Sequence, residues 1–130
     1  MTHFEILSLY VALHSLLLVV LSFRVGQVRM KKQVNLGDGG HRQLQARIRA
    51  HGNYIEYAPL ALIGLFALAY LDAAPLMLHI FGAGFFIARI LHAMGMAGKN
   101  ALGKGRLIGM LMTVLTLIGQ AGCILFLIFT

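Results

Sequence analysis

Four long apolar stretches constrain this chain more than any other feature of its sequence. They cover residues 4–23, 54–71, 75–96 and 107–129, and the last of them contains no charged residue. Each has about the 20 residues that a helix needs to cross the hydrocarbon core of a bilayer. Because lipid offers the backbone no hydrogen-bond partners, segments that cross it must be helical. The sequence therefore predicts an all-α fold, an integral membrane four-helix bundle.

The composition agrees with a chain whose main solvent is lipid. Only 12% of its residues are charged, whereas about a quarter are charged in soluble domains. A length of 130 residues leaves room for four spans, so we expect a single domain over 1–130 with connections at about 24–52 and 97–106. A large soluble enzyme is excluded.

The basic residues predict the orientation in the membrane. Ten of the 11 lysines and arginines fall in the two connections, with Lys99, Lys104 and Arg106 in the second. Basic connections stay in the cytoplasm, so we expect both termini on the outer side. This topology accounts for the net charge of +7, and we expect no nucleic-acid partner because no nucleic-acid-binding module is recognisable.

Polar residues at helical spacing interrupt two of the stretches or their ends. Arg49, Asn53 and Glu56 lie at i, i+4 and i+7, which places them on one face of a helix. Arg89 and His92 lie at i and i+3 on another. A charge near the bilayer centre costs about 2.5–3.5 kcal/mol on insertion scales, so such residues usually face protein or a water-filled cavity.

Both polar faces are expected near the cytoplasmic surface, which leaves two interpretations. In the first, Glu56 and Arg89 form an ion pair that serves the structure alone. In the second, the surplus donors around them form a half-buried cleft for an anionic ligand. The surplus donors are Arg29, Arg49, Asn53 and His92.

Other polar residues in the stretches have structural interpretations. Thr113, Thr116 and Gln120 follow one face of the fourth stretch, as interhelical hydrogen bonds require. We interpret His14 as an interior histidine. The six histidines are dispersed, without ligand pairs at i and i+4, so we expect no metal site.

The polar motifs resemble those of the MAPEG family, the membrane-associated proteins in eicosanoid and glutathione metabolism. The segment Arg49-Ala-His-Gly-Asn53-Tyr-Ile-Glu56-Tyr57-Ala-Pro59 resembles the family's second-helix signature, and Arg89-Ile-Leu-His92-Ala-Met-Gly95 resembles its third-helix motif. The resemblance covers nearly the whole chain. It is strongest to the small bacterial inner-membrane branch, including the turn Gly37-Asp-Gly-Gly40, which implies the bacterial inner membrane with both termini in the periplasm.

The resemblance implies a homotrimer that holds glutathione between neighbouring subunits near the cytoplasmic face. Glutathione carries two carboxylates, an amine and a thiol, which suit guanidinium groups, an acid and a donor aimed at sulfur. By similarity, Arg49, Asn53 and Arg29 would bind carboxylates. Glu56 would bind the amino group, and Tyr57 would contact the ligand backbone. Arg89 and His92 would line or brace the pocket.

The catalytic step depends on a donor that stabilises the glutathione thiolate. Making the thiolate the main form at neutral pH takes about 2.7 kcal/mol of preferential stabilisation. In the family this donor is an arginine or tyrosine that follows the third-helix motif. Here Met96 occupies the tyrosine's position, while Lys104 and Arg106 fall near the arginine's place. Arg106 is the first candidate for thiolate stabilisation and Lys104 the second.

Three functions remain open from the sequence. The first is a glutathione transferase or peroxidase acting on lipophilic small molecules that enter from the lipid bilayer. The second is a scaffold that binds lipid or glutathione without chemistry, a hypothesis that Met96 favours. The third is a four-span cation exporter, which ranks last because Glu5 lies at the outer edge and Glu56 is crowded by arginines.

Overall fold

Four helices make up almost all of the structure, a computed structural model that describes residues 1–97 and 103–130. They are α1 (His3–Lys32), α2 (Arg42–Tyr70), α3 (Pro75–Met96) and α4 (Lys104–Phe129). The predicted all-α four-helix fold is confirmed. All four helices are long and apolar enough to cross a membrane.

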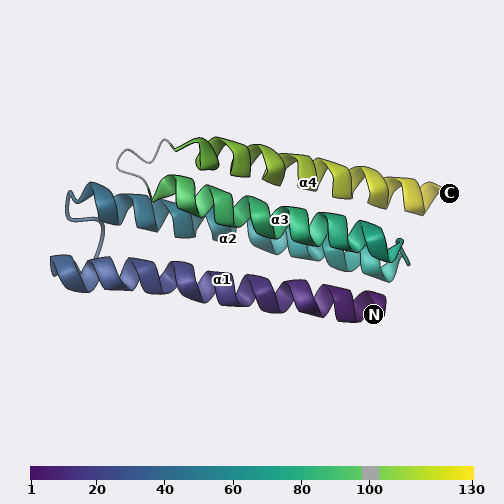
Figure 1. Ribbon diagram of the computed structural model, residues 1–130, viewed down its shortest axis with the longest axis horizontal. Helices are drawn as coiled ribbons and strands as arrows, with labels where there is room; N and C mark the ends of the chain where they lie inside the picture. Colours follow the sequence, from purple (N-terminus) through teal and green to yellow (C-terminus); the bar gives the residue numbers. More distant parts are fainter. Residues whose placement is uncertain (98–102) are drawn as a thin grey trace.

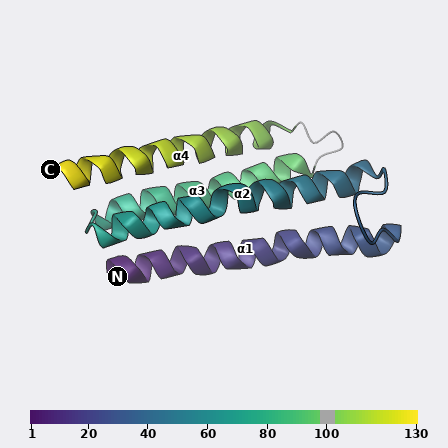
Figure 2. The same ribbon diagram turned by 180° about the vertical axis from the view of Figure 1, so that it is seen from behind.

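The helices run side by side, with α2 and α3 in the middle, α1 flanking one side and α4 the other (Figures 1 and 2). Both chain termini lie at one end of the bundle, which we call the terminal end. The opposite end, where α1 stops and α2 and α4 begin, is called the loop end. All lysines and arginines among the described residues lie in the loop-end half of their helices.

The helices extend beyond the apolar stretches at the loop end. α1 continues past Phe23 to Lys32, and α2 begins at Arg42, so the connection expected over 24–52 is shortened to residues 33–41. The helices continue because nothing in these polar segments breaks them before the turn, where Gly37, Gly39 and Gly40 all adopt positive φ. α4 begins at Lys104, ahead of the predicted 107, and Lys99 lies outside the described residues.

Sequence signals at the terminal end fix where α1 and α3 begin. Thr2 and Glu5 form a capping box, in which the Glu5 backbone N–H donates to Thr2 Oγ1 at 3.2 Å and the Thr2 N–H donates to the Glu5 carboxylate at 2.8 Å. Pro75 occupies the first turn of α3, where its missing N–H costs nothing.

Apolar side chains fill the interior and also cover the outside. One buried cluster lies toward the terminal end, around Ile6, Leu65 and Leu78. Large apolar side chains such as Leu60 and Leu115 are more than 60% exposed. A surface of this kind suits contact with lipid acyl chains.

Glycines bring α3 and α4 into close backbone contact near the loop end. A β-carbon on Gly109 would collide with the Ala88 carbonyl oxygen and with the His92 backbone, and one on Gly95 would collide with the backbone of Arg106. These contacts set the separation of α3 and α4 where the polar residues lie.

We expect Gly109→Ala to destabilise the bundle, because both obstacles are backbone atoms that cannot rotate away. Overpacking of this kind costs about 1–3 kcal/mol. The matched control is Gly122→Ala in the same helix, where a β-carbon meets nothing within 4 Å. Denaturant unfolding in detergent, followed by circular dichroism, measures both. Equal stability of the two variants would contradict close packing at Gly109.

Candidate functional site

Arg89 ties three helices together in the loop-end half of the bundle. The residue is only 1% exposed. Its Nη2 donates to Asn53 Oδ1 on α2 at 2.8 Å, and its Nη1 donates to Thr113 Oγ1 on α4 at 3.4 Å. Nη2 also lies 3.4 Å from Nδ1 of His92, one turn along α3. Arg89 is therefore the centre of a buried polar network.

Two tyrosine rings of α2 pack against the guanidinium group of Arg89. Its central carbon lies 5.8 Å from the ring centroid of Tyr54 and 5.9 Å from that of Tyr57, within the range of cation–π attraction. The Tyr54 hydroxyl donates to the His14 carbonyl oxygen at 2.8 Å and lies 2.9 Å from His14 Nδ1. The network thus reaches α1, and the groups that contact the buried cation are neutral.

Glu56 pairs with Arg49 along its own helix. The distance from Arg49 Nη1 to Glu56 Oε1 is 3.9 Å, and the two side chains are 63% and 53% exposed. In the described part of the chain Glu56 forms no ion pair with Arg89, so the first interpretation of these two residues is wrong; the Arg89 guanidinium instead bonds the amide of Asn53. An exposed ion pair contributes at most about 1 kcal/mol to stability. Arg49 and Glu56 can therefore separate and bind a ligand instead at little cost in free energy.

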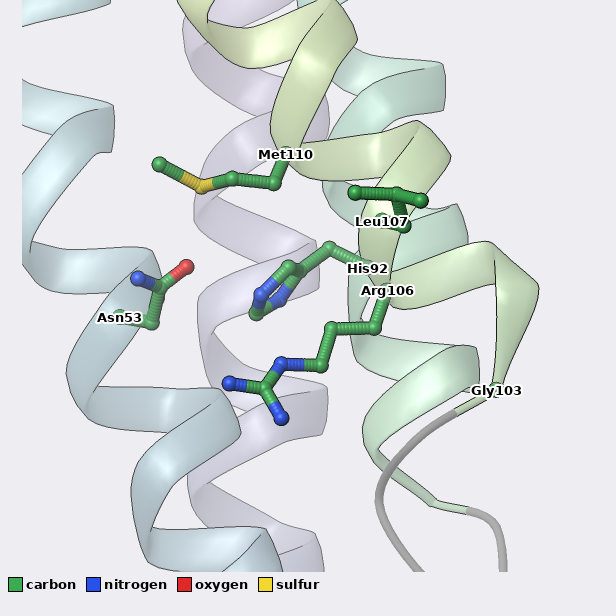
Figure 3. A pocket seen from close by; sticks show the side chains of 6 residues that line it. All are labelled: Asn53, His92, Gly103, Arg106, Leu107 and Met110. Carbon is green, nitrogen blue, oxygen red and sulfur yellow. The ribbon is translucent and has the colours of Figure 1, made fainter.

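A cleft of about 570 Å³ opens beside this network. The residues that line it come from α2, α3 and the start of α4: Asn53, His92, Gly103, Arg106, Leu107 and Met110. Figure 3 shows the Arg106 and Met110 side chains extending from α4 toward α2, with the His92 ring beside Arg106. The cleft combines cationic and polar donors on one side with an apolar wall on the other.

Helical spacing explains which residues of α4 reach the cleft. Arg106 and Met110 lie at i and i+4, so they share one face, and Leu107 lies about one turn before Met110. Leu107 and Met110 were not among the predicted site residues. The helical spacing from Arg106 could have indicated Met110. In a membrane helix, however, an apolar side chain that lines a cleft looks the same in sequence as one that faces lipid.

The structure brings together three of the residues that the sequence singled out. Asn53, His92 and Arg106 line the cleft, and Arg89 supports two of them from behind. Tyr57 reaches the site through its contact with Arg89.

Arg49 and Glu56 do not line the cleft, and Arg29 and Lys104 lie apart from it. Arg29 Nη1 donates to backbone carbonyl oxygens of the 33–41 connection, the shortest contact being 2.9 Å to Gly37. Lys104 is the exposed first residue of α4, and neither residue is among the cleft-lining residues. Their predicted roles stay predictions.

Positive charge at the loop end favours an anionic ligand. Burial, and then the nearby charge of Arg24, lower the pKa of Arg47. Of the four acidic residues, Glu5 and Asp72 lie at the terminal end. The loop end therefore carries an excess of cations.

Comparison with known proteins adds a family to this geometry. The model of the MAPEG family matches residues 7–126. The inner membrane protein YecN of Escherichia coli K12 is 40% identical over 88 residues, which cover 68% of this chain and 67% of the relative. The protein of the same name from E. coli O6:H1 matches to the same extent. No solved structure matches.

Proposed function

The chain belongs to the MAPEG family of membrane proteins, and on this premise we propose that it binds glutathione at the loop end and transfers it to lipophilic electrophiles. The observation that carries the proposal is the convergence of Asn53, His92 and Arg106 on one cleft. Arg49 and Glu56 lie about one helical turn before and after Asn53 on α2, and both are exposed. Together these groups offer partners for carboxylates, an amine and a thiolate.

The exposed ion pair supports assembly into a homotrimer. Glu56 lies one turn before Leu60 and two before Ile63, which are both 62% exposed and suited to lipid. A half-exposed carboxylate at this position would be costly against acyl chains. A neighbouring protomer that covers this face would remove the cost and enclose glutathione between subunits. The loop end would then face the cytoplasm, with both termini in the periplasm.

The cleft also suits the chemistry of glutathione conjugation. Arg106 would stabilise the thiolate as the thiol proton passes to water, and the sulfur would then attack an electrophilic carbon and expel its leaving group as an anion. Leu107 and Met110 provide an apolar wall for a substrate that arrives from the bilayer. Reduction of a lipid hydroperoxide by two glutathiones, which leaves an alcohol, water and glutathione disulfide, is the peroxidase form of the same activity.

A scaffold without chemistry is the second candidate, and Met96 is the observation that favours it. This residue is 7% exposed and supplies no hydroxyl at the position where family enzymes place a tyrosine. A scaffold would keep the pocket for glutathione or a lipid and form no product.

Conjugate formation decides between the two candidates. The purified protein is mixed with glutathione and a panel of aromatic halides, epoxides and lipid hydroperoxides, and products are identified by mass spectrometry. We expect conjugate or disulfide above the uncatalysed rate with at least one substrate. Saturable glutathione binding without any product would establish the scaffold instead.

A further inference from the structure

The hydrogen bonds of Arg89 determine which atoms of its neighbours can donate to a ligand. A guanidinium group has only donors. Its short contact to Asn53 Oδ1, at 2.8 Å, therefore fixes that amide with its oxygen toward Arg89. The contact to Thr113 and the two tyrosine rings restrain the same guanidinium from other sides. Together these contacts restrain the orientation of the Arg89 guanidinium.

The same restraint acts on His92, which is 4% exposed. Nδ1 of this ring faces Arg89 Nη2 at 3.4 Å. A proton on Nδ1 would place two buried donors against each other, at the cost of an unsatisfied polar group. The neutral ring must therefore accept at Nδ1 and carry its proton on Nε2.

We propose that Arg89 is a positioning residue, which holds His92 in its Nε2–H tautomer so that His92 donates to an anionic group in the cleft. Figure 3 shows the His92 ring beside the Arg106 guanidinium. A donor on the ring and the positive charge of Arg106, which lines the same cleft, together call for an acceptor that carries negative charge. A thiolate or carboxylate fits this requirement, whereas an ammonium group does not. That this anion belongs to glutathione rests on the proposed function.

The tautomer can be measured without any ligand. The protein is labelled with ¹⁵N-histidine in detergent at mildly alkaline pH, and the His92 signals are assigned by comparison with His92→Gln. We expect protonated Nε2 and bare Nδ1 in the native protein. The same pattern is expected in Arg89→Lys, because an ammonium group also only donates. In Arg89→Gln the amide oxygen can accept, so a share of Nδ1–H should appear.

His51 is the internal control for these spectra, because it bonds Ser22 at 3.0 Å and has no contact with Arg89 within the described residues. Its tautomer should be the same in all variants. Nδ1–H at His92 in the native protein would overturn the proposal, even if Arg89→Gln does not fold. An unchanged tautomer in folded Arg89→Gln would overturn it as well.

Glutathione binding separates this inference from the proposed function. Affinity for glutathione should fall about tenfold in Arg89→Gln and recover at least in part in Arg89→Lys. A protein with the Nε2–H tautomer that binds no glutathione would remove the proposed function and leave the positioning role intact. Affinity that is equal in the native protein and Arg89→Gln would overturn the role of Arg89 toward the ligand.

Discussion

Replacing Arg106 with alanine will return bound glutathione from the thiolate to the thiol at neutral pH. Arg106 projects from the first turn of α4 into the cleft, where its positive charge would lie next to sulfur. Preferential stabilisation of the thiolate by about 2.7 kcal/mol corresponds to about a hundredfold in the acid dissociation constant. The ultraviolet absorbance of the thiolate measures the change directly, and the conjugation rate should fall with it.

Two further variants locate the effect. Lys31→Ala removes an exposed cation from the end of α1, and we expect it to leave the thiolate signal unchanged. Lys104→Ala tests the second predicted donor, which lies two residues before Arg106 on α4 but does not line the cleft. A signal that survives in Arg106→Ala and disappears in Lys104→Ala would transfer the role to Lys104. Survival in both variants would show that neither stabilises the thiolate.

Replacing Arg49 with alanine will weaken glutathione binding about 10- to 100-fold, the usual range for one hydrogen bond to a charged group. Its partner Glu56 lies at 3.9 Å and both side chains are largely exposed, so loss of the pair should leave stability nearly unchanged. Isothermal titration gives the affinity. Arg42→Ala, at the exposed start of α2, removes the same charge and should bind like the native protein. Equal weakening by both substitutions would indicate a general charge effect.

Glu56→Gln extends this test to the amino group of the ligand. The substitution keeps the side chain's shape and removes its charge, so glutathione should bind about tenfold more weakly. An analogue that lacks the amino group should bind the native protein and Glu56→Gln equally well. A similar loss for both ligands would mean that Glu56 acts on the fold of the site.

The fold could be predicted from the sequence because each signal for it lies within one helix. Apolar length identifies a span without knowledge of its neighbours, and helical periodicity places Asn53 with Arg49 and Glu56. The residues at which the helices end were harder to predict from the sequence. Residues 24–32 read as a basic connection, yet they extend α1 to Lys32, because positive charge alone does not break a helix.

The contacts between helices were beyond sequence reasoning. Periodicity placed Glu56 and Asn53 on the same face and could not determine which of them meets Arg89, because that depends on the rotation of α2 against α3. The structure selects Asn53. For the same reason, the capture of Arg29 by carbonyl oxygens of the 33–41 connection had no signal in the sequence.

The most direct test compares glutathione with its diethyl ester in equilibrium binding to the native protein. The ester keeps the thiol and amine but carries no carboxylate, so it lacks the charges that the loop-end guanidinium groups would recognise. We expect saturable binding of glutathione and affinity for the ester that is lower by about tenfold or more. Equal affinity for the two ligands, or no saturable binding of either, would contradict the claim that the guanidinium groups at the loop end recognise an anionic tripeptide.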